Sequence, residues 1–152
     1  MTPKKELAVA ALRDGTVIDH IPSRALFKCV KILGLENMAS QLTIGNNLHS
    51  SKWDSKGIIK VADVFFPEKT LNRIALLAPN AVINTIREFA VTEKRPVVLP
   101  ETIVGIVKCD NPKCITNNEP MKTRFSVISR EPVVLKCHYC NHSIKAEKAT
   151  IL

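Results

Sequence analysis

The sequence predicts an α+β protein in two parts, and three observations carry this prediction. Residues 7–91 contain apolar runs that read in the order strand, helix, strand, strand, helix, strand. The segment "TEKRPVVLPE", residues 92–101, has two prolines and mixed charges, which are typical of a linker. The residues after it are too few to bury a self-sufficient core, yet they hold two close cysteine pairs. We therefore expect one domain at residues 1–100 and a second at residues 101–152.

The first strand and helix are predicted around a glycine and a proline. The runs "LAVAAL" and "TVIDHI" are separated by a turn at Gly15 and both have strand character. After Pro22, Ser23 is expected to cap a helix, since serine is a favoured N-cap residue. The apolar positions of this helix follow helical spacing and comprise Leu26, Phe27, Val30 and Leu33. Cys29 lies close to the same face, and we expect it to be a small buried core residue.

The rest of the N-terminal part continues the alternation. "QLTIGNNL" and "GIIKVADVFF" are predicted strands joined by a polar loop that holds Trp53. Pro67 is expected to open a second helix that Pro79 and Asn80 end, with one apolar side made of Leu71, Ile74, Ala75 and Ala78. "AVINTIREFAV", residues 81–91, alternates as a last strand. This order is the ferredoxin-like split βαβ arrangement, an antiparallel sheet with two helices on one face.

The cysteines of the C-terminal part have the spacing of a metal site. "VKCDNPKC" and "LKCHYC" form a C-x4-C…C-x2-C pattern with 22 residues between the pairs. Each pair can occupy a tight turn that points two sulfurs at one Zn²⁺ ion, giving the ligands Cys109, Cys114, Cys137 and Cys140. His138 or His142 could replace one sulfur, although His138 lies inside a turn that should direct its side chain away from the ion. Four protein ligands leave no open position, so a zinc ion here is structural.

Two strands are predicted between the cysteine pairs. They are "RFSVIS" and "PVVLK", and with the metal they give a zinc-ribbon-like β domain. Because disulfides are rare where thiols stay reduced, the cluster also agrees with a cytoplasmic protein. No apolar run approaches the roughly 20 residues of a membrane helix. The short run "LAVAAL" is cut off by Arg13 and Asp14, which argues against a signal peptide.

The chain is basic, with a formal charge of +8 and an isoelectric point near 9.4. Four thiolates and one Zn²⁺ would lower this to about +6. A positive charge favours polyanions such as nucleic acid, nucleotides or an acidic protein surface. The basic residues are dispersed among acidic and apolar ones, however, so a solvated surface with good solubility explains the charge equally well.

The stretch "GTVIDHIP" raises the question of catalysis, because Asp19 and His20 could form an acid–base couple. Adjacent strand residues point to opposite faces, which makes them poor partners for proton transfer. The sequence has no nucleophile elbow and no G-x-x-x-x-G-K-[ST] phosphate loop. Lys60, Asn84 and Lys94 are polar groups with the apolar neighbours Val9, Val17, Ile86 and Val91. Such a set can hold a nucleotide without transferring its phosphates.

Two other functions are compatible with parts of the sequence. A nucleic-acid-binding zinc-ribbon protein would explain the charge and the cysteines, but five Phe, one Trp and one Tyr give only seven aromatic residues and the basic residues form no stripe. A small nucleotide-using enzyme lacks a nucleophile, a paired base and a phosphate loop. We therefore expect neither an enzyme nor a nucleic-acid-binding protein.

The chain resembles the regulatory chain of aspartate carbamoyltransferase nearly end to end. The resemblance rests on "DGTVIDHIP", "LTIGNNL", "APNAVINTI", "RPVVLPE", "CDNPKCITNNEP" and "LKCHYC" and on the spacing between them. It implies a cytoplasmic, non-catalytic subunit of pyrimidine biosynthesis. The subunit would form a regulatory dimer through its N-terminal domain and dock on catalytic trimers through a domain with one structural zinc. In this family CTP inhibits, ATP activates, and UTP can reinforce CTP.

The resemblance also implies roles for individual residues. Asp19 and Lys60 would meet the ribose, and His20, Asn84 and Lys94 would lie near the phosphates. The base would be surrounded by Val9, Leu12, Val17, Ile86, Phe89 and Val91. Asn111, Glu119 and Arg130 match positions that face the catalytic chain. Three positions depart from the family pattern: Glu6 and Phe89 replace a lysine and a tyrosine, and Lys113 replaces an asparagine. Glu6 bears on the second nucleotide and hence on the UTP effect, and Lys113 bears on the interface with the catalytic chain.

Overall fold

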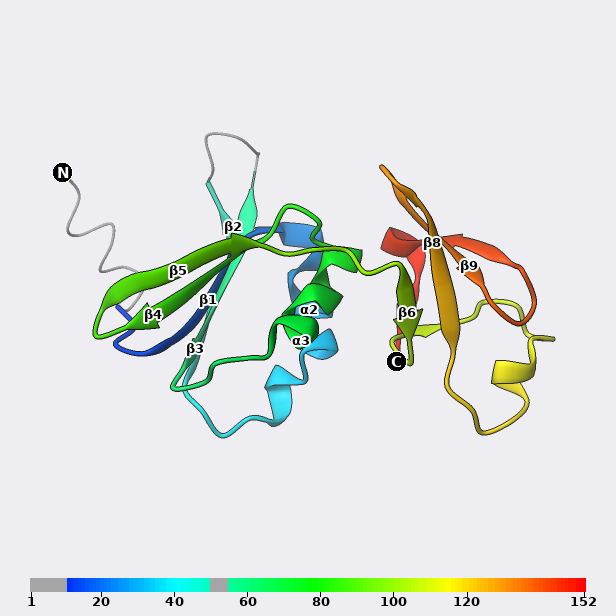
Figure 1. Ribbon diagram of the computed structural model, residues 1–152, viewed down its shortest axis with the longest axis horizontal. Helices are drawn as coiled ribbons and strands as arrows, with labels where there is room; N and C mark the ends of the chain where they lie inside the picture. The colour runs from blue at the N-terminus through cyan, green and yellow to red at the C-terminus, as the bar shows by residue number, and fades with distance from the viewer. Residues whose placement is uncertain (1–10, 50–54) are drawn as a thin grey trace.

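The computed structural model describes residues 11–49 and 55–152. Its N-terminal part is a five-stranded antiparallel sheet in the order β2-β3-β1-β4-β5. The strands are β1 (Gly15–Pro22), β2 (Leu42–Leu48), β3 (Lys56–Ala62), β4 (Val82–Arg87) and β5 (Ala90–Pro96). The first four strands have the order of the predicted ferredoxin-like arrangement, which the structure thus confirms (Figure 1). Val9 and Trp53 lie outside the described residues.

The fifth strand corrects the predicted linker. Residues 92–96 do not connect two domains but belong to β5, which pairs with β4 along the edge of the sheet. The chain doubles back between these strands at Glu88 and Phe89, whose φ angles are 49° and 66°. Phe89 is therefore in a hairpin turn, and the predicted last strand at 81–91 is two strands. Pro96 is tolerated because it ends an edge strand, where a missing N–H disturbs the sheet least.

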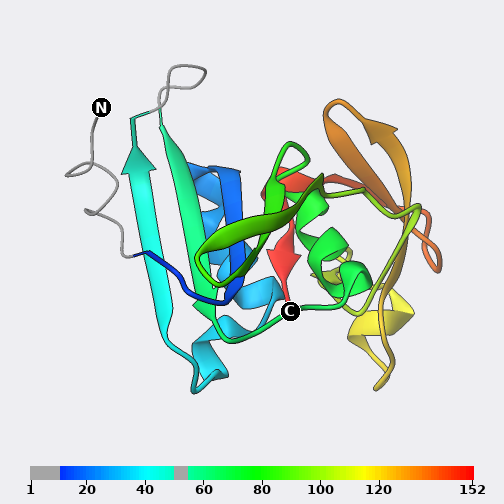
Figure 2. The same ribbon diagram turned by 60° about the vertical axis from the view of Figure 1, so that its left-hand side comes forward.

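Both helices cover the same face of this sheet. A 3-10 turn (Ser23–Ala25) leads into α2 (Leu26–Ile32), and a second 3-10 turn follows at Leu35–Asn37. The other helix, α3 (Glu68–Asn72), continues as a 3-10 turn at Arg73–Leu76. Figure 1 and Figure 2 show α2 and α3 between the sheet and the C-terminal strands. The predicted apolar side of the second helix is confirmed, since Leu71, Ile74, Ala75 and Ala78 are all buried.

The first helix differs from its prediction in two residues. Ser23 makes no capping hydrogen bond, because the chain enters through a 3-10 turn with Pro22 at its start. Phe27 is 67% exposed, whereas Cys29 is completely buried with Leu26. Positions 26, 29, 30 and 33 already form the i, i+3, i+4, i+7 stripe, so Phe27 falls beside it. The burial predicted for Cys29 is confirmed.

The start of the described chain also departs from the prediction. Ala11 and Leu12, the end of the run "LAVAAL", belong to no strand. Gly15 begins β1 with a φ of 142°, and a Cβ atom on it would lie 2.1 Å from the carbonyl oxygen of Val61. Only glycine fits this close approach of two strands.

The C-terminal part contains two small antiparallel sheets. One has the order β10-β9-β8-β6, built from β6 (Thr102–Val104), β8 (Arg124–Arg130), β9 (Val133–Cys137) and β10 (Ser143–Lys145). The other pairs β7 (Val107–Lys108) with β11 (Thr150–Ile151), and 3-10 turns lie at Ile115–Asn117 and Ala146–Lys148. The strands predicted between the cysteine pairs are β8 and β9. Phe125 of β8 and Leu135 of β9 are fully buried.

Helix α2 contacts the end of the chain directly. The ammonium group of Lys31 donates to the backbone carbonyl oxygen of Ile151 over 2.9 Å, and that of Lys28 donates to the backbone carbonyl oxygen of Glu147 over 3.2 Å. The buried residues of the two parts form one continuous hydrophobic cluster. Within residues 11–49 and 55–152, no helix is long and apolar enough to cross a membrane.

Candidate metal centre and nucleotide face

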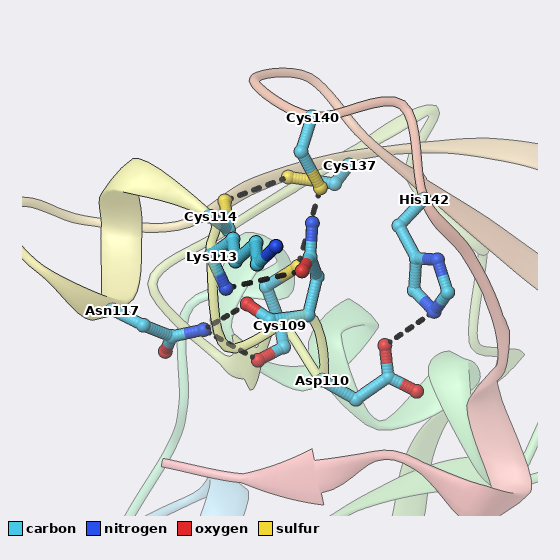
Figure 3. Close-up of polar contacts among 9 residues, drawn as sticks. Cys109, Asp110, Lys113, Cys114, Asn117, Cys137, Cys140 and His142 are labelled. Carbon is cyan, nitrogen blue, oxygen red and sulfur yellow. Dashed lines mark hydrogen bonds and ion pairs between the residues drawn. The ribbon is translucent and has the colours of Figure 1, made fainter.

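The four predicted cysteines meet at one point. Their sulfur atoms lie within 4.8 Å of one another, with 3.6 Å between Cys109 and Cys140 and 3.7 Å between Cys114 and Cys137 (Figure 3). Sulfurs at the corners of a tetrahedron with zinc–sulfur bonds of about 2.3 Å are separated by about 3.8 Å. The spacing and the all-thiol donor set therefore fit one tetrahedral metal ion. Neither His138 nor His142 is part of the cluster.

Hydrogen bonds hold each pair of cysteines in a loop. In the first loop, Asn117 donates its side-chain amide to the carbonyl oxygens of Cys109 and Asn111. The backbone N–H of Cys114 donates to Asn111 over 3.0 Å. In the second loop, the N–H of Asn141 donates to Cys137 over 2.9 Å. Asn117 was not predicted from the sequence, although a side-chain amide carries two N–H donors that can satisfy two carbonyl oxygens.

The surroundings shift the pKa values of the cysteine thiols in opposite directions. Burial raises the pKa of Cys109 and of Cys137, since it disfavours the thiolate. Burial also acts on Cys140, but hydrogen bonds from Asn111 and from the backbone of His142, with the neighbouring Cys109 and Cys137, bring its pKa down to about 6. Cys140 is thus more ready to ionise than Cys109 or Cys137. A cation at the centre would favour the thiolate form of all four.

The second predicted site forms a row across the sheet. Val17 of β1 pairs with Lys60 of β3 on one side and with Asn84 of β4 on the other. Asn84 in turn pairs with Lys94 of β5. Directly paired residues share a face of a sheet, so four strands place Lys60, Val17, Asn84 and Lys94 in one line. The adjacent row, Ile59, Ile18 and Ile83, is buried against the helices. The row of Lys60 therefore lies on the face turned away from α2 and α3.

Asp19 and His20 were predicted to point to opposite faces of the strand, and the structure differs from this prediction. A bulge interrupts β1 between Ile18 and Ile21, and His20 has a φ of 61°. Because the bulge breaks the strand alternation, Asp19 and His20 do not point apart, and their Oδ2 and Nδ1 atoms are 3.6 Å apart. The other oxygen of Asp19 accepts from the N–H of His20 over 2.7 Å and from Lys56 over 3.0 Å.

Lys56 is a residue that the sequence prediction missed. It lies four positions before Lys60 in β3, and residues an even number apart share a face of a strand. This period-2 spacing of lysines in "KGIIK" was the available signal. Burial lowers the pKa of Lys60, while the negative charge of Asp19 acts to raise it. The folded chain therefore disfavours the charge on Lys60, and this contribution to stability improves as the pH rises from the lowered pKa towards 10.5.

The apolar residues predicted around a base are distributed along this face. Val17 and Ile86 are buried, whereas Val91 and Phe89 are 58% and 67% exposed. Ile86 pairs with Val91 and with Gly15, next to the row of Lys60. A cavity of about 430 Å³ is lined by Leu12, Thr43, Lys60, Asp63 and Phe89. The turn after β4, which holds Phe89, therefore lines the same cavity as Lys60, at one end of the row of Lys60, Val17, Asn84 and Lys94.

The residues expected at a partner interface do not form one cluster. Asn111 lies within the first metal loop, where its Oδ1 atom accepts from the N–H of Lys113 over 3.1 Å, and the exposed Glu119 follows that loop. Arg130 lies at the far end of β8, five positions beyond Phe125, which pairs with Cys137. At about 3.4 Å per residue this is about 17 Å from the metal end of the strand. The guanidinium of Arg130 donates to the carbonyl oxygen of Leu99 over 3.2 Å.

Together these features define a two-part, metal-binding α+β protein with a polar row on the open face of its larger sheet. Comparison with known families gives two matches: the aspartate carbamoyltransferase regulatory chain, allosteric domain, over residues 7–98, and the metal binding domain of the same chain over residues 101–150. The chain belongs to the family of aspartate carbamoyltransferase regulatory chains.

Individual relatives agree over almost their whole length. The chain is 57% identical to the aspartate carbamoyltransferase regulatory chain of Parabacteroides distasonis, covering 97% of this chain and 96% of the relative. It is 54% identical to that of Bacteroides fragilis, with 98% and 97% covered. The chain of the same name from Pyrococcus horikoshii is 45% identical, with 94% and 95% covered. These relatives are named as regulatory chains and not as catalytic subunits, so this chain is a regulatory one.

Proposed function

We propose that the chain binds nucleoside triphosphates on the open face of its five-stranded sheet, with CTP as inhibitor and ATP as activator. The effect would pass through a structural zinc domain to the catalytic trimers of aspartate carbamoyltransferase, the enzyme of pyrimidine biosynthesis. One observation carries the proposal: Lys60, Val17, Asn84 and Lys94 come from four strands and line up on one face. Membership of a family with an allosteric domain supports the same assignment.

The side chains of this face differ in chemistry, and each kind would bind a different part of the nucleotide. A triphosphate carries about four negative charges, which Lys94, Asn84 and His20 would hold. Asp19 would accept hydrogen bonds from the ribose hydroxyls, with Lys60 beside it. The base would rest on Val17 and Ile86 and reach the cavity near Leu12 and Phe89. Val9 and Val91 complete the proposed set, and the UTP effect depends further on the region of Glu6.

The metal of the C-terminal part is, in this proposal, one zinc ion per chain. Four thiol donors with near-tetrahedral sulfur spacing are the typical ligands of structural zinc. The ion would fix both loops and with them the surface of Asn111 and Glu119, which together with Arg130 would contact the catalytic chain. Residues 1–100 would form the nucleotide-binding and dimerising domain and residues 101–152 the zinc domain of a cytoplasmic complex that binds no nucleic acid.

Purification of the tagged chain from a native extract tests this function. We expect a carbamoyltransferase catalytic chain to accompany it in stoichiometric amount and to be lost when zinc is removed. The matched control is the same purification after nuclease treatment, which should not change the yield of partner. Recovery of nucleic acid in place of a catalytic chain, with a salt-dependent yield, would instead support the nucleic-acid-binding alternative.

A further inference from the structure

A histidine and an aspartate outside the thiol cluster connect its two loops. The Nε2 atom of His142 lies 2.7 Å from the Oδ1 atom of Asp110 (Figure 3). Asp110 directly follows the ligand Cys109, and His142 comes two residues after the ligand Cys140. The two loops are 22 residues apart at their nearest ligands, so this contact joins segments that the chain itself does not hold together.

The backbone of His142 takes part in the second loop as well. Its carbonyl oxygen accepts from the N–H of Cys137 over 2.8 Å, which closes the loop around the C-x2-C pair. The side chain of the same residue reaches the first loop. On the other side, Asp110 lies between Cys109 and Asn111, whose carbonyl oxygens are both held by Asn117. The contact therefore links two loops that are each already fixed locally.

We infer that Asp110 and His142 form a latch that holds the two metal-binding loops together and slows release of the metal. For the ion to leave, sulfurs of one loop must separate from those of the other, and the latch opposes this movement. Groups outside the ligand set commonly set metal affinity by orienting the ligands. Both side chains are about half exposed, at 48% and 59%, so water screens the contact and its effect should be moderate.

The inference is tested by the rate at which the zinc-loaded full-length chain gives up its metal to the chromogenic chelator 4-(2-pyridylazo)resorcinol. Exposed polar contacts of this kind correspond to a factor of about two to five, so His142→Ala and Asp110→Ala should each speed release by about that factor. The double variant should be no faster than either single one, because both changes remove the same contact. His142→Gln, which keeps a side-chain N–H donor, should restore much of the slow rate.

His138→Ala is the matched control, because His138 is an exposed histidine of the same loop that stacks edge-on against Tyr139. It should release metal at the wild-type rate. Unchanged release in both single variants, or effects that multiply in the double variant, would overturn the latch. If His142→Ala binds no metal at all, His142→Gln decides, and a release rate equal to that of wild type supports the latch. The inference rests on the proposed metal occupancy: a wild-type chain that binds no zinc refutes that occupancy, whereas zinc-bound variants with wild-type rates refute the latch alone.

Discussion

Replacement of Cys114 by serine is expected to abolish stable metal binding and unfold the C-terminal part of the chain. Cys114 is 1% exposed, and its sulfur lies 3.7 Å from that of Cys137 at the centre of the cluster. A hydroxyl group is a poor replacement for a thiolate, so the site loses a charge and its tetrahedral geometry. Structural zinc contributes about 10–16 kcal/mol in small domains at neutral pH. Metal content and the amide spectrum of residues 101–152 are the measurements.

Cys29→Ala is the control for this change. Cys29 is also fully buried, and burial raises the pKa of its thiol to about 12, but it is not part of the four-cysteine cluster. Its loss should cost about 1 kcal/mol of unfolding free energy and leave one metal per chain. A Cys114→Ser chain that keeps its metal and assembles normally would show that the ion does not organise this part of the molecule.

Replacement of Lys94 by alanine is expected to lower the affinity of the chain for CTP and for ATP by the same factor. The two nucleotides share their phosphates, and Lys94 lies at the exposed end of the row across the sheet. A hydrogen bond to a charged group contributes about 1.5–3 kcal/mol, and the exposure of Lys94 places the effect near the lower value, about tenfold. Titration calorimetry of both nucleotides measures it. Basal turnover of the assembled complex should not change, because the reaction belongs to another chain.

Lys69→Ala provides the control, since Lys69 is an exposed lysine of α3 on the opposite side of the sheet. It removes the same charge without touching the row and should leave both affinities unaltered. Asp19→Ala should lower the affinity for both nucleotides, because it removes the proposed acceptor of hydrogen bonds from the ribose hydroxyls. Unchanged binding in Lys94→Ala and Asp19→Ala together would mean that the site lies elsewhere. Loss of basal turnover with binding intact would instead return Asp19 and His20 to a catalytic role.

The metal cluster could be predicted from the sequence because its information is local. Each cysteine pair spans at most six residues, and a metal ion demands a narrow geometry. The row of Lys60, Val17, Asn84 and Lys94 could not be predicted in this way, because its members come from four strands. The residue types of Lys60, Asn84 and Lys94 indicated a charged ligand, and the family resemblance gave them roles, but their alignment required the pairing registers of the sheet.

The errors arose where the backbone departs from regular geometry. Asp19 and His20 were predicted to point apart because regular strand alternation was assumed. A bulge with a positive φ at His20 breaks that alternation. The strand β5 was mistaken for a linker because its charges and Pro96 belong to an edge strand, where burial does not select apolar residues. The turn at Glu88 and Phe89 contains no glycine or asparagine, the residues that usually indicate a hairpin.

The most direct test of the account is the rate of carbamoyl transfer, as a function of aspartate concentration, by a complex assembled from this chain and catalytic trimers. The account predicts that CTP raises the aspartate concentration needed for half-maximal rate and that ATP lowers it. Coupling of about 1–3 kcal/mol would shift affinity by about 5- to 150-fold. The isolated chain should show no turnover. Curves that coincide with and without either nucleotide, or carbamoyl transfer by the isolated chain, would contradict it.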